Sequence, residues 1–246
     1  MNKNPENPTE YFRWEFGVTG ELYLMRQLSG KLKTIFDVGS NVGEWTRMAR
    51  EFNPDAQIHS FEVLGSVFKK QMGNLQPDDK MILNSFGLAH QTGIIEMAYN
   101  PEYDAISTMF QEFDVGSDNK ESGFVVKGDD YVRARKVDSI DFLKIDVEGA
   151  EQLVLQGLEE TIKNNKVGII FFEYGFVNVL SKFLLVDAYR ILQPLGYRIG
   201  KYTEEGWSPK DFQLTDEDFG HRTGKHVLAV HDSKMDLFGD RLSVFA

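Results

Sequence analysis

The sequence predicts an α/β fold in which a mostly parallel sheet is connected by helices. Short apolar runs alternate with segments of helical periodicity along most of the chain, which is typical of strand–helix–strand units. The segment 167–173 (VGIIFFE) is apolar almost throughout, as expected for a central parallel strand covered on both faces. The 246 residues, 41% of them hydrophobic and 26% charged, match one ordinary globular domain and exclude a largely disordered chain.

The expected strands and helices follow one another in order along the chain. The strands are expected at 34–38, 57–62, 81–86, 140–146, 167–173, 198–203 and 225–231. The helices are expected at 43–52, 66–74, 149–164 and 181–193. In the helix at 149–164, the residues that fall at helical spacing on one face are Ala150, Leu153, Val154, Leu158 and Ile162. The run Pro194-Leu195-Gly196 is a stop signal for the last helix.

Three segments fall outside this alternation. Residues 1–30 are rich in aromatic side chains and are expected to form a helical N-terminal extension, which leaves 31–246 as a single domain. Residues 90–128 form an insertion between the third and fourth strands, and its polar part at 112–123 is expected to be a mobile loop. Residues 204–224 are expected to form a long acidic loop, and loops of that length in compact domains are commonly functional.

The composition excludes several classes of protein. The chain contains no cysteine, which rules out disulfide scaffolds, cysteine-ligated zinc, iron–sulfur clusters and thiol nucleophiles. Its formal net charge of -11 argues against a broad surface for nucleic acid or anionic membrane. No apolar run approaches the roughly 20 residues of a membrane helix, and the N-terminal residues lack the apolar core of a signal peptide. We therefore expect a cytoplasmic protein without nucleic-acid or membrane partners.

A glycine-containing loop follows the first predicted strand. Its sequence is Asp37-Val38-Gly39-Ser40-Asn41-Val42-Gly43, and it leads into a helix whose free N–H groups favour a carboxylate or phosphate. The spacing matches neither the Gly-x-Gly-x-x-Gly of dinucleotide enzymes nor a P-loop. Glu62, at the end of the second strand, is placed to accept hydrogen bonds from both hydroxyls of a ribose. The loop and Glu62 predict a nucleoside-type ligand; turn glycines beside an edge carboxylate are the alternative interpretation.

The charge at the start of this loop narrows the choice of nucleoside. Asp37 would repel a pyrophosphate, but it suits a ligand that carries an ammonium and a sulfonium group. S-Adenosylmethionine carries both groups, and it adds a ribose for Glu62 and a carboxylate for the helix N-terminus. We therefore predict S-adenosylmethionine as the cofactor.

A second motif ends the fourth predicted strand and opens the helix after it. It reads Phe142-Leu143-Lys144-Ile145-Asp146-Val147-Glu148-Gly149-Ala150-Glu151, followed by Val154-Leu155-Gln156-Gly157. Together with the glycine loop and with Ser107-Thr108 between the two motifs, this string resembles the FkbM family of S-adenosylmethionine-dependent methyltransferases. The resemblance covers about residues 33–231, and the KIDVEGAE string is its specific part.

The resemblance implies a class I methyltransferase fold, which is a Rossmann-like, mostly parallel sheet with an antiparallel last strand and helices on both faces. It also implies methyl transfer to oxygen in many members, with acceptors among sugars and secondary metabolites. The residues carried over to cofactor binding are Asp37, Gly39, Asn41, Gly43, Glu62, Ser85, Phe86 and Asp146. Ser85 and Phe86 would border the adenine, and Asp146 would lie beside the transferable methyl group. Where the family often has a proline after the acid of the second strand, this chain has Val63-Leu64-Gly65.

Methyl transfer to a hydroxyl requires that a proton leave the acceptor. A carboxylate or histidine base can remove it, and a divalent metal can lower the pKa of the acceptor. Asp146 and Glu173 end neighbouring strands, which lie about 4.8 Å apart, so they are the expected catalytic carboxylates. The same two residues are candidate ligands of Mg²⁺, which prefers oxygen ligands. His90, after the third strand, is a further candidate base. Purely structural roles for these side chains are the competing interpretation.

The leading hypothesis is an O-methyltransferase that acts on a carbohydrate, such as a nucleotide-sugar, or on another small hydroxylated metabolite. The acceptor pocket is expected from residues 1–30, 99–128 and 204–224. An N-methyltransferase, or a methyltransferase of glycans or peptides, is the alternative within the class. An NAD-type oxidoreductase is disfavoured by the missing Gly-x-Gly-x-x-Gly, and an adenosyl-binding regulator by the pairing of Asp146 with Glu173. A homodimer is compatible with the sequence.

Overall fold

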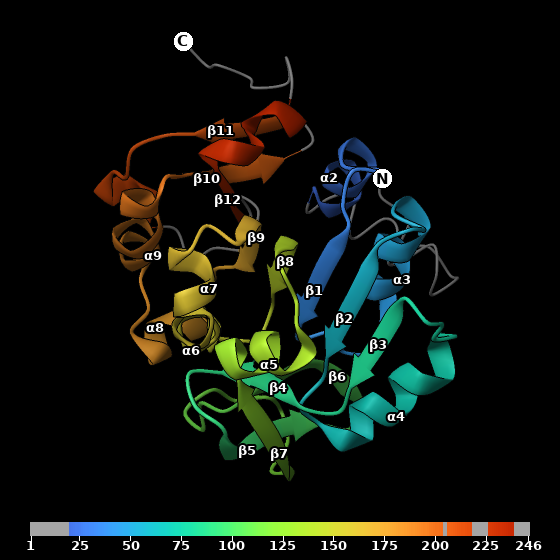
Figure 1. The fold of residues 1–246 in the computed structure, drawn as a ribbon. Helices are drawn as coiled ribbons and strands as arrows, with labels where there is room; N and C mark the ends of the chain where they lie inside the picture. The colour runs from blue at the N-terminus through green and yellow to red at the C-terminus, as the bar shows by residue number, and fades with distance from the viewer. Residues whose placement is uncertain (1–19, 204–205, 218–225, 239–246) are drawn as a thin grey trace, which may run out of the picture.

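The protein is built on an eight-stranded sheet with the order β11-β10-β12-β9-β8-β1-β2-β3 (Figure 1). The computed structural model describes residues 20–203, 206–217 and 226–238. The strands of this sheet are β1 (Thr34–Val38), β2 (Gln57–Phe61), β3 (Met81–Asn84), β8 (Ile140–Ile145), β9 (Val167–Glu173), β10 (Tyr197–Thr203), β11 (Gly206–Pro209) and β12 (His226–His231). Strands β3, β2, β1, β8 and β9 pair in parallel, whereas β12 is antiparallel to β9 and β10. The predicted mostly parallel sheet with an antiparallel last strand is confirmed.

Helices cover both faces of this sheet because the buried strands are apolar on both faces. Phe36 and Leu143 belong to one core, together with residues of α5, α6, α7 and α9. Their neighbours Ile35 and Phe142 belong to a second core, together with residues of α2 and α3. The helices are α2 (Glu21–Gln27), α3 (Glu44–Phe52), α4 (Gly65–Asn74), α5 (Gly128–Arg135), α6 (Glu151–Gly157), α7 (Glu159–Lys163), α8 (Val177–Ser181) and α9 (Leu185–Leu192). In the described ranges, none of them combines the length and the apolar character needed to cross a bilayer.

Two of the predicted helices are interrupted. The segment expected to be helical over 149–164 forms α6 and α7, which meet at Leu158, where the backbone leaves the helical region and the side chain is fully buried. The helix expected at 181–193 begins only at Leu185, and it continues as the short 3-10 helix Gln193–Leu195. Before it, α8 ends at Ser181, and the next residue, Lys182, has a left-handed conformation with φ of 59°. The helix α8 therefore adds a turn beside the end of β9.

The predicted insertion folds into a second, four-stranded sheet with the order β4-β7-β5-β6. Its strands are β4 (Gly87–Ala89), β5 (Gly93–Asn100), β6 (Tyr103–Thr108) and β7 (Lys120–Lys127). The loop expected at 112–123 therefore ends earlier, because residues from Lys120 onward pair with β5. In Figure 1 the arrowheads of β2 and β3 point toward this second sheet. The second sheet thus lies at the edge of the main sheet where a ligand is expected.

The segment expected to be a loop over 204–224 is partly a strand in its described residues. Strand β11 pairs with β10 at the edge of the main sheet. Trp207 of β11 is fully buried, and its Nε1 donates to the carbonyl of Leu228 at 3.3 Å. A short 3-10 helix follows at Leu214–Asp216. The acidic composition of the segment gives no sign of this strand. Burial of the Trp207 side chain and backbone pairing with β10 stabilise it.

Candidate active site

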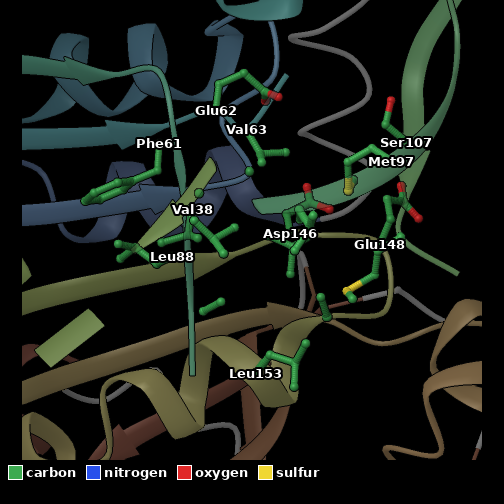
Figure 2. A pocket seen from close by; sticks show the side chains of 18 of the residues that line it. Val38, Phe61, Glu62, Val63, Leu88, Met97, Ser107, Asp146, Glu148 and Leu153 are labelled. Carbon is green, nitrogen blue, oxygen red and sulfur yellow. The ribbon is translucent and has the colours of Figure 1, made fainter. Parts of the chain in front are cut away.

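A cavity opens at the carboxyl ends of the parallel strands, between the main sheet and the second sheet (Figure 2). The loops after β1, β2 and β8 contribute Gly39, Asn41, Glu62 and Asp146. The apolar part of the lining includes Val63, Leu88, Met97, Met109 and Leu153. Figure 2 shows Asp146 between Leu88 and Phe61 on one side and Met97 and Glu148 on the other. Ligands of open α/β sheets bind at this edge.

The loop after β1 touches the loop after β8 at Gly39. Gly39 has φ of +82°, and a β-carbon there would lie 1.7 Å from the backbone oxygen of Asp146. Only glycine permits both this conformation and this contact. The N–H groups of Gly39 and Ser40 each donate to the carbonyl of Phe61 at 3.0 Å. The two sequence motifs are therefore in direct contact, and the loop is fastened to the end of β2.

Glu62 lies at the edge of the cavity, at the position predicted for the ribose. Its side chain lines the cavity although the residue is only 7% exposed. One carboxylate oxygen accepts from the N–H of Leu64 at 2.9 Å, and the other from the N–H of Asn41 at 2.9 Å. Burial raises the pKa of Glu62 to about 7, although both hydrogen bonds favour the ionised form. The residues that stand in place of the family's proline thus hold Glu62 through Leu64.

Asp37 and Gly43 support the glycine loop from behind and are not among the described residues that line the cavity. The Asp37 carboxylate is fully buried, accepts from the Thr46 hydroxyl at 2.6 Å and lies 3.5 Å from the Lys144 Nζ. Burial raises the pKa of Asp37, and Lys144 and Thr46 oppose that change. Gly43 precedes α3, and its N–H donates to the carbonyl of Ser40 at 2.9 Å. The cation that Asp37 faces is therefore Lys144, where we expected a ligand's ammonium group.

Lys144 is a central residue of the site that the sequence reasoning missed. It is 3% exposed, and its Nζ donates to Asp146 Oδ2 at 3.0 Å. The same Nζ lies 5.6 Å from the centre of the Trp45 ring, a cation–π distance. Burial alone would lower the pKa of Lys144, but the Asp146 and Asp37 carboxylates outweigh it and raise the pKa. The available signal was a lysine between the apolar residues Leu143 and Ile145 of a buried strand, since such a charge requires partners.

Three carboxylates meet beside Lys144. Asp146, Glu148 and Glu173 each present an oxygen within 4.8 Å of the others. Burial would raise the pKa of Asp146, but Lys144 and a side-chain hydrogen bond with Glu173 lower it below its usual range. Asp146 is therefore ionised. The structure brings together the two predicted carboxylates and adds Glu148.

Two more buried groups lie close to this cluster. His226 begins β12 directly opposite Glu173, and its ring stacks on Phe171 with centroids 4.6 Å apart. Its Nε2 lies 3.9 Å from the carboxylate of Glu21, the first residue of α2. The electrostatic effect of His226 also lowers the pKa of Asp146. Neither residue could be found from a motif, because an antiparallel strand and an N-terminal helix bring them to the site.

The other predicted site residues take different places. His90 lines the cavity but is exposed. Ser85 is exposed and Phe86 packs against the Phe61 and Tyr131 rings, at 6.1 and 5.9 Å between centroids. Neither Ser85 nor Phe86 is among the described residues that line the cavity, since β3 ends at Asn84 and the chain turns there. Leu88 and Ala89 of β4 line it in their stead.

Ser107 and Thr108, at the end of β6, join the second sheet to this site. The hydroxyl of Thr108 donates to the backbone carbonyl of Glu148 at 2.8 Å. Glu148 has a left-handed conformation with φ of 50°, which is uncommon for a residue other than glycine and often marks a functional loop. Ser107 lines the cavity, and its buried Oγ has no hydrogen-bond partner among the described residues. A ligand could supply that partner.

Comparison with known proteins relates the chain to methyltransferases. The family described as the methyltransferase FkbM domain matches residues 37–199. The 2-O-methyltransferase NoeI of Sinorhizobium fredii is 28% identical over 176 residues, which are 64% of this chain and 71% of that protein. A proposed O-methyltransferase from Klebsiella pneumoniae has a similar fold, with a TM-score of 0.50, 12% identity, and coverage of 92% of this chain and 91% of that chain. A proposed caffeoyl-CoA O-methyltransferase from Staphylococcus aureus has a TM-score of 0.47 and 12% identity, covering 92% of this chain and 93% of that one.

Proposed function

The chain belongs to the FkbM family of S-adenosylmethionine-dependent methyltransferases, and we propose that it methylates a hydroxyl group of a carbohydrate or another small hydroxylated molecule. The observation that carries this proposal is the ionised Asp146 carboxylate, which Lys144 holds in the cavity beside the glycine loop. A carboxylate at this position can accept the proton of an alcohol. The relative NoeI, whose name specifies transfer to oxygen, supports the same type of acceptor atom.

The cofactor lies across the loops that contribute Gly39, Asn41 and Glu62. Glu62 accepts hydrogen bonds from the ribose, and the chain between Gly39 and Gly43 receives the methionine part at the N-terminal end of α3. The adenine packs against the apolar side chains around Leu88 and Leu153, a set that includes neither Ser85 nor Phe86. Asp37 keeps the loop in place through Thr46 and Lys144.

The reaction is an in-line displacement at the methyl carbon. The acceptor oxygen forms a bond to that carbon while the carbon–sulfur bond breaks, and S-adenosylhomocysteine leaves as a neutral thioether. The acceptor proton passes to the Asp146 carboxylate as the oxygen loses electron density. Alignment of the two reacting atoms can contribute up to about 7–11 kcal/mol. Most of the catalytic effect is therefore expected from positioning, with Asp146 as the base and Glu173 as its hydrogen-bond partner.

A divalent cation is the second candidate for activation of the hydroxyl. Asp146, Glu148 and Glu173 form a set of hard oxygen donors of the kind that Mg²⁺ prefers. A cation held there would lower the pKa of the acceptor hydroxyl. Treatment with EDTA separates the two candidates, because turnover through the carboxylate base survives chelation and turnover through a metal does not.

We propose a small molecule as the acceptor for two reasons. The cavity lies between the two sheets, and the chain is acidic. A formal net charge of -11 opposes binding to the phosphate backbone of a nucleic acid. A base that acts on a hydroxyl favours transfer to oxygen over transfer to nitrogen, since an amine acceptor can attack without a strong base.

Calorimetric titration with S-adenosylhomocysteine and with NAD tests the cofactor. We expect binding of the first and none of the second, and the opposite result would refute the proposal. A screen of hydroxylated acceptors, nucleotide-sugars first, then measures release of S-adenosylhomocysteine. With an acceptor in hand, Asp146→Ala should keep cofactor binding and lose transfer. Loss of cofactor binding in this variant would show that Asp146 holds the cofactor and does not act on the acceptor.

A further inference from the structure

A buried pair of polar side chains connects the two loops that carry the active-site carboxylates. Glu151, the first residue of α6, is 1% exposed. One oxygen of its carboxylate accepts from the N–H groups of Val147 and Gly149, each at 3.2 Å. These are backbone groups of the loop after β8, on either side of Glu148. Glu151 therefore holds the loop that follows Asp146.

Asn178 holds the loop after β9 in the same way. It belongs to α8 and is 2% exposed, and its Oδ1 accepts from the N–H of Gly175 at 2.8 Å. Its Nδ2 donates to the second carboxylate oxygen of Glu151 at 2.6 Å. The helices that follow the two loops are thus joined by a short hydrogen bond from Asn178 to Glu151.

We propose that Glu151 and Asn178 are positioning residues, which fix the loop bearing Asp146 and Glu148 relative to the loop that follows Glu173. This inference rests on the proposed methyltransferase function. Neither side chain is among the described residues that line the cavity, so the pair does not touch the reacting atoms. Its effect is on geometry. Asp146 precedes Val147 and Glu173 lies two residues before Gly175, so a shift of either loop changes the distance between the two carboxylates.

Substitutions can break this connection while each side chain keeps its shape. In Glu151→Gln, the remaining oxygen still serves Val147 and Gly149, but the new amide N–H₂ faces the N–H₂ of Asn178. Rotation of the Asn178 amide would relieve that clash only by placing its N–H₂ against the N–H of Gly175. In Asn178→Asp, two carboxylate oxygens face each other. The double variant restores a donor and an acceptor with their direction reversed, and it keeps the net charge of the natural protein.

Amide hydrogen exchange tests the connection without cofactor or acceptor. In Glu151→Gln, we expect exchange about tenfold faster at 147–149 and 174–178, and we expect the double variant to recover the natural rates. Glu159→Gln is the matched control, since Glu159 is exposed at the start of α7 and, among the described residues, its side chain forms an ion pair with Lys163 alone. Unchanged exchange in the single variants, or no recovery in the double variant, overturns the pairing.

Steady-state kinetics test the positioning role. With the acceptor found by the screen, we expect kcat of Glu151→Gln to fall about 10- to 100-fold, with the KM for S-adenosylmethionine nearly unchanged. The double variant should recover most of kcat. Faster exchange with natural kcat, or a loss confined to KM, contradicts the role. Failure of the natural protein to bind S-adenosylhomocysteine would instead refute the proposed function. The exchange experiment would still test the hydrogen bond between Glu151 and Asn178, because it uses neither cofactor nor acceptor.

Discussion

Lys144 balances the charge of the active site. In the parallel pairing of β1 with β8 it lies directly beside Asp37, and its ammonium also reaches Asp146. One buried cation thus serves one carboxylate that supports the cofactor loop and one that faces the cavity. With Glu148 and Glu173, the site holds four acidic side chains and this one lysine, an excess of acidic groups. Such an excess suits a cofactor that carries a sulfonium and an ammonium group.

Replacement of Lys144 tests this balance. Lys144→Met leaves the buried Asp37 and the partly exposed Asp146 without their cation. Breaking a buried pair costs about 3–5 kcal/mol. Urea unfolding should show the loss. Lys163→Met is the control, because it removes an exposed pair with Glu159, and such pairs are worth at most about 1 kcal/mol. Equal stability of the two variants would contradict the account of Lys144.

Glu62 gives the site a dependence on pH. Its pKa is raised to about 7, so the carboxyl is mostly neutral at pH 6 and mostly ionised at pH 8. The ionised form accepts two ribose hydroxyls better than the neutral acid, and therefore the Kd for S-adenosylhomocysteine should tighten as the pH rises. The ionised fraction increases about tenfold between those two pH values. Calorimetry at both values measures the change, and Glu62→Gln should bind weakly and equally at both.

The common position of Gly39, Asn41 and Glu62 at one edge of the sheet could be predicted from sequence, whereas their partners could not. Gly39, Asn41 and Glu62 follow strands that are recognisable by their apolar runs, so their common edge can be inferred. The pairing of Asp37 with Lys144 depends on the register between β1 and β8, and no local pattern specifies that register. Local patterns also misplace strand ends. The third strand was expected to end at Phe86 but ends at Asn84, so Ser85 and Phe86 lie beyond it.

At the scale of elements, the second sheet forms part of the site. It packs against the residues after Glu62, where Val63 lies between Gly87 and Gly123. A β-carbon at Gly123 would lie 2.4 Å from Val63 Cγ2 and 2.7 Å from the Val63 carbonyl oxygen. The N-terminal end of α4 is held from the same strand, since Glu121 accepts from the N–H of Ser66 at 3.0 Å. The second sheet thereby packs against the loop after β2.

Gly123→Ala should displace the second sheet from this loop. We expect a loss of stability of about 1–3 kcal/mol, the usual range for overpacking, together with weaker binding of S-adenosylhomocysteine. Gly73→Ala is the matched control, because Gly73 is exposed in α4, nothing lies within 4 Å of an added β-carbon, and alanine favours helix. Thermal unfolding and calorimetry report the two effects. Natural affinity in Gly123→Ala would argue against a role of the second sheet in cofactor binding.

The elements of the main sheet follow from local patterns, whereas the second sheet does not. Strands β1 and β9 lie where their apolar runs predicted them, at Thr34–Val38 and Val167–Glu173. Strand β7 begins in a polar stretch, and it becomes a strand only because β5 offers a partner about 25 residues earlier. Strand β11 likewise depends on β10 and on a cavity in the core that Trp207 fills.

At the scale of the whole molecule, the described part of the N-terminal segment belongs to the core. Leu24, Met25 and Leu28 of this segment are fully buried in the cluster that also contains Trp45 and Phe171. Glu21 of the same helix lies beside His226 near the active site. We therefore propose that the boundary at residue 30 separates segments of sequence and not units of folding. The helices packed on both faces of the sheet together position the carboxyl ends of its strands.

The fold class, the cofactor and the carboxylates converge on methyl transfer to a hydroxyl, and one measurement tests that claim most directly. The protein is incubated with S-adenosylmethionine labelled with ¹³C in the methyl group and with the acceptor from the screen, and the product is analysed by NMR. We predict that the labelled carbon is bonded to oxygen, as a methyl ether. Label bonded to nitrogen or carbon, or no transfer to any hydroxylated acceptor by protein that binds S-adenosylhomocysteine, would contradict the account.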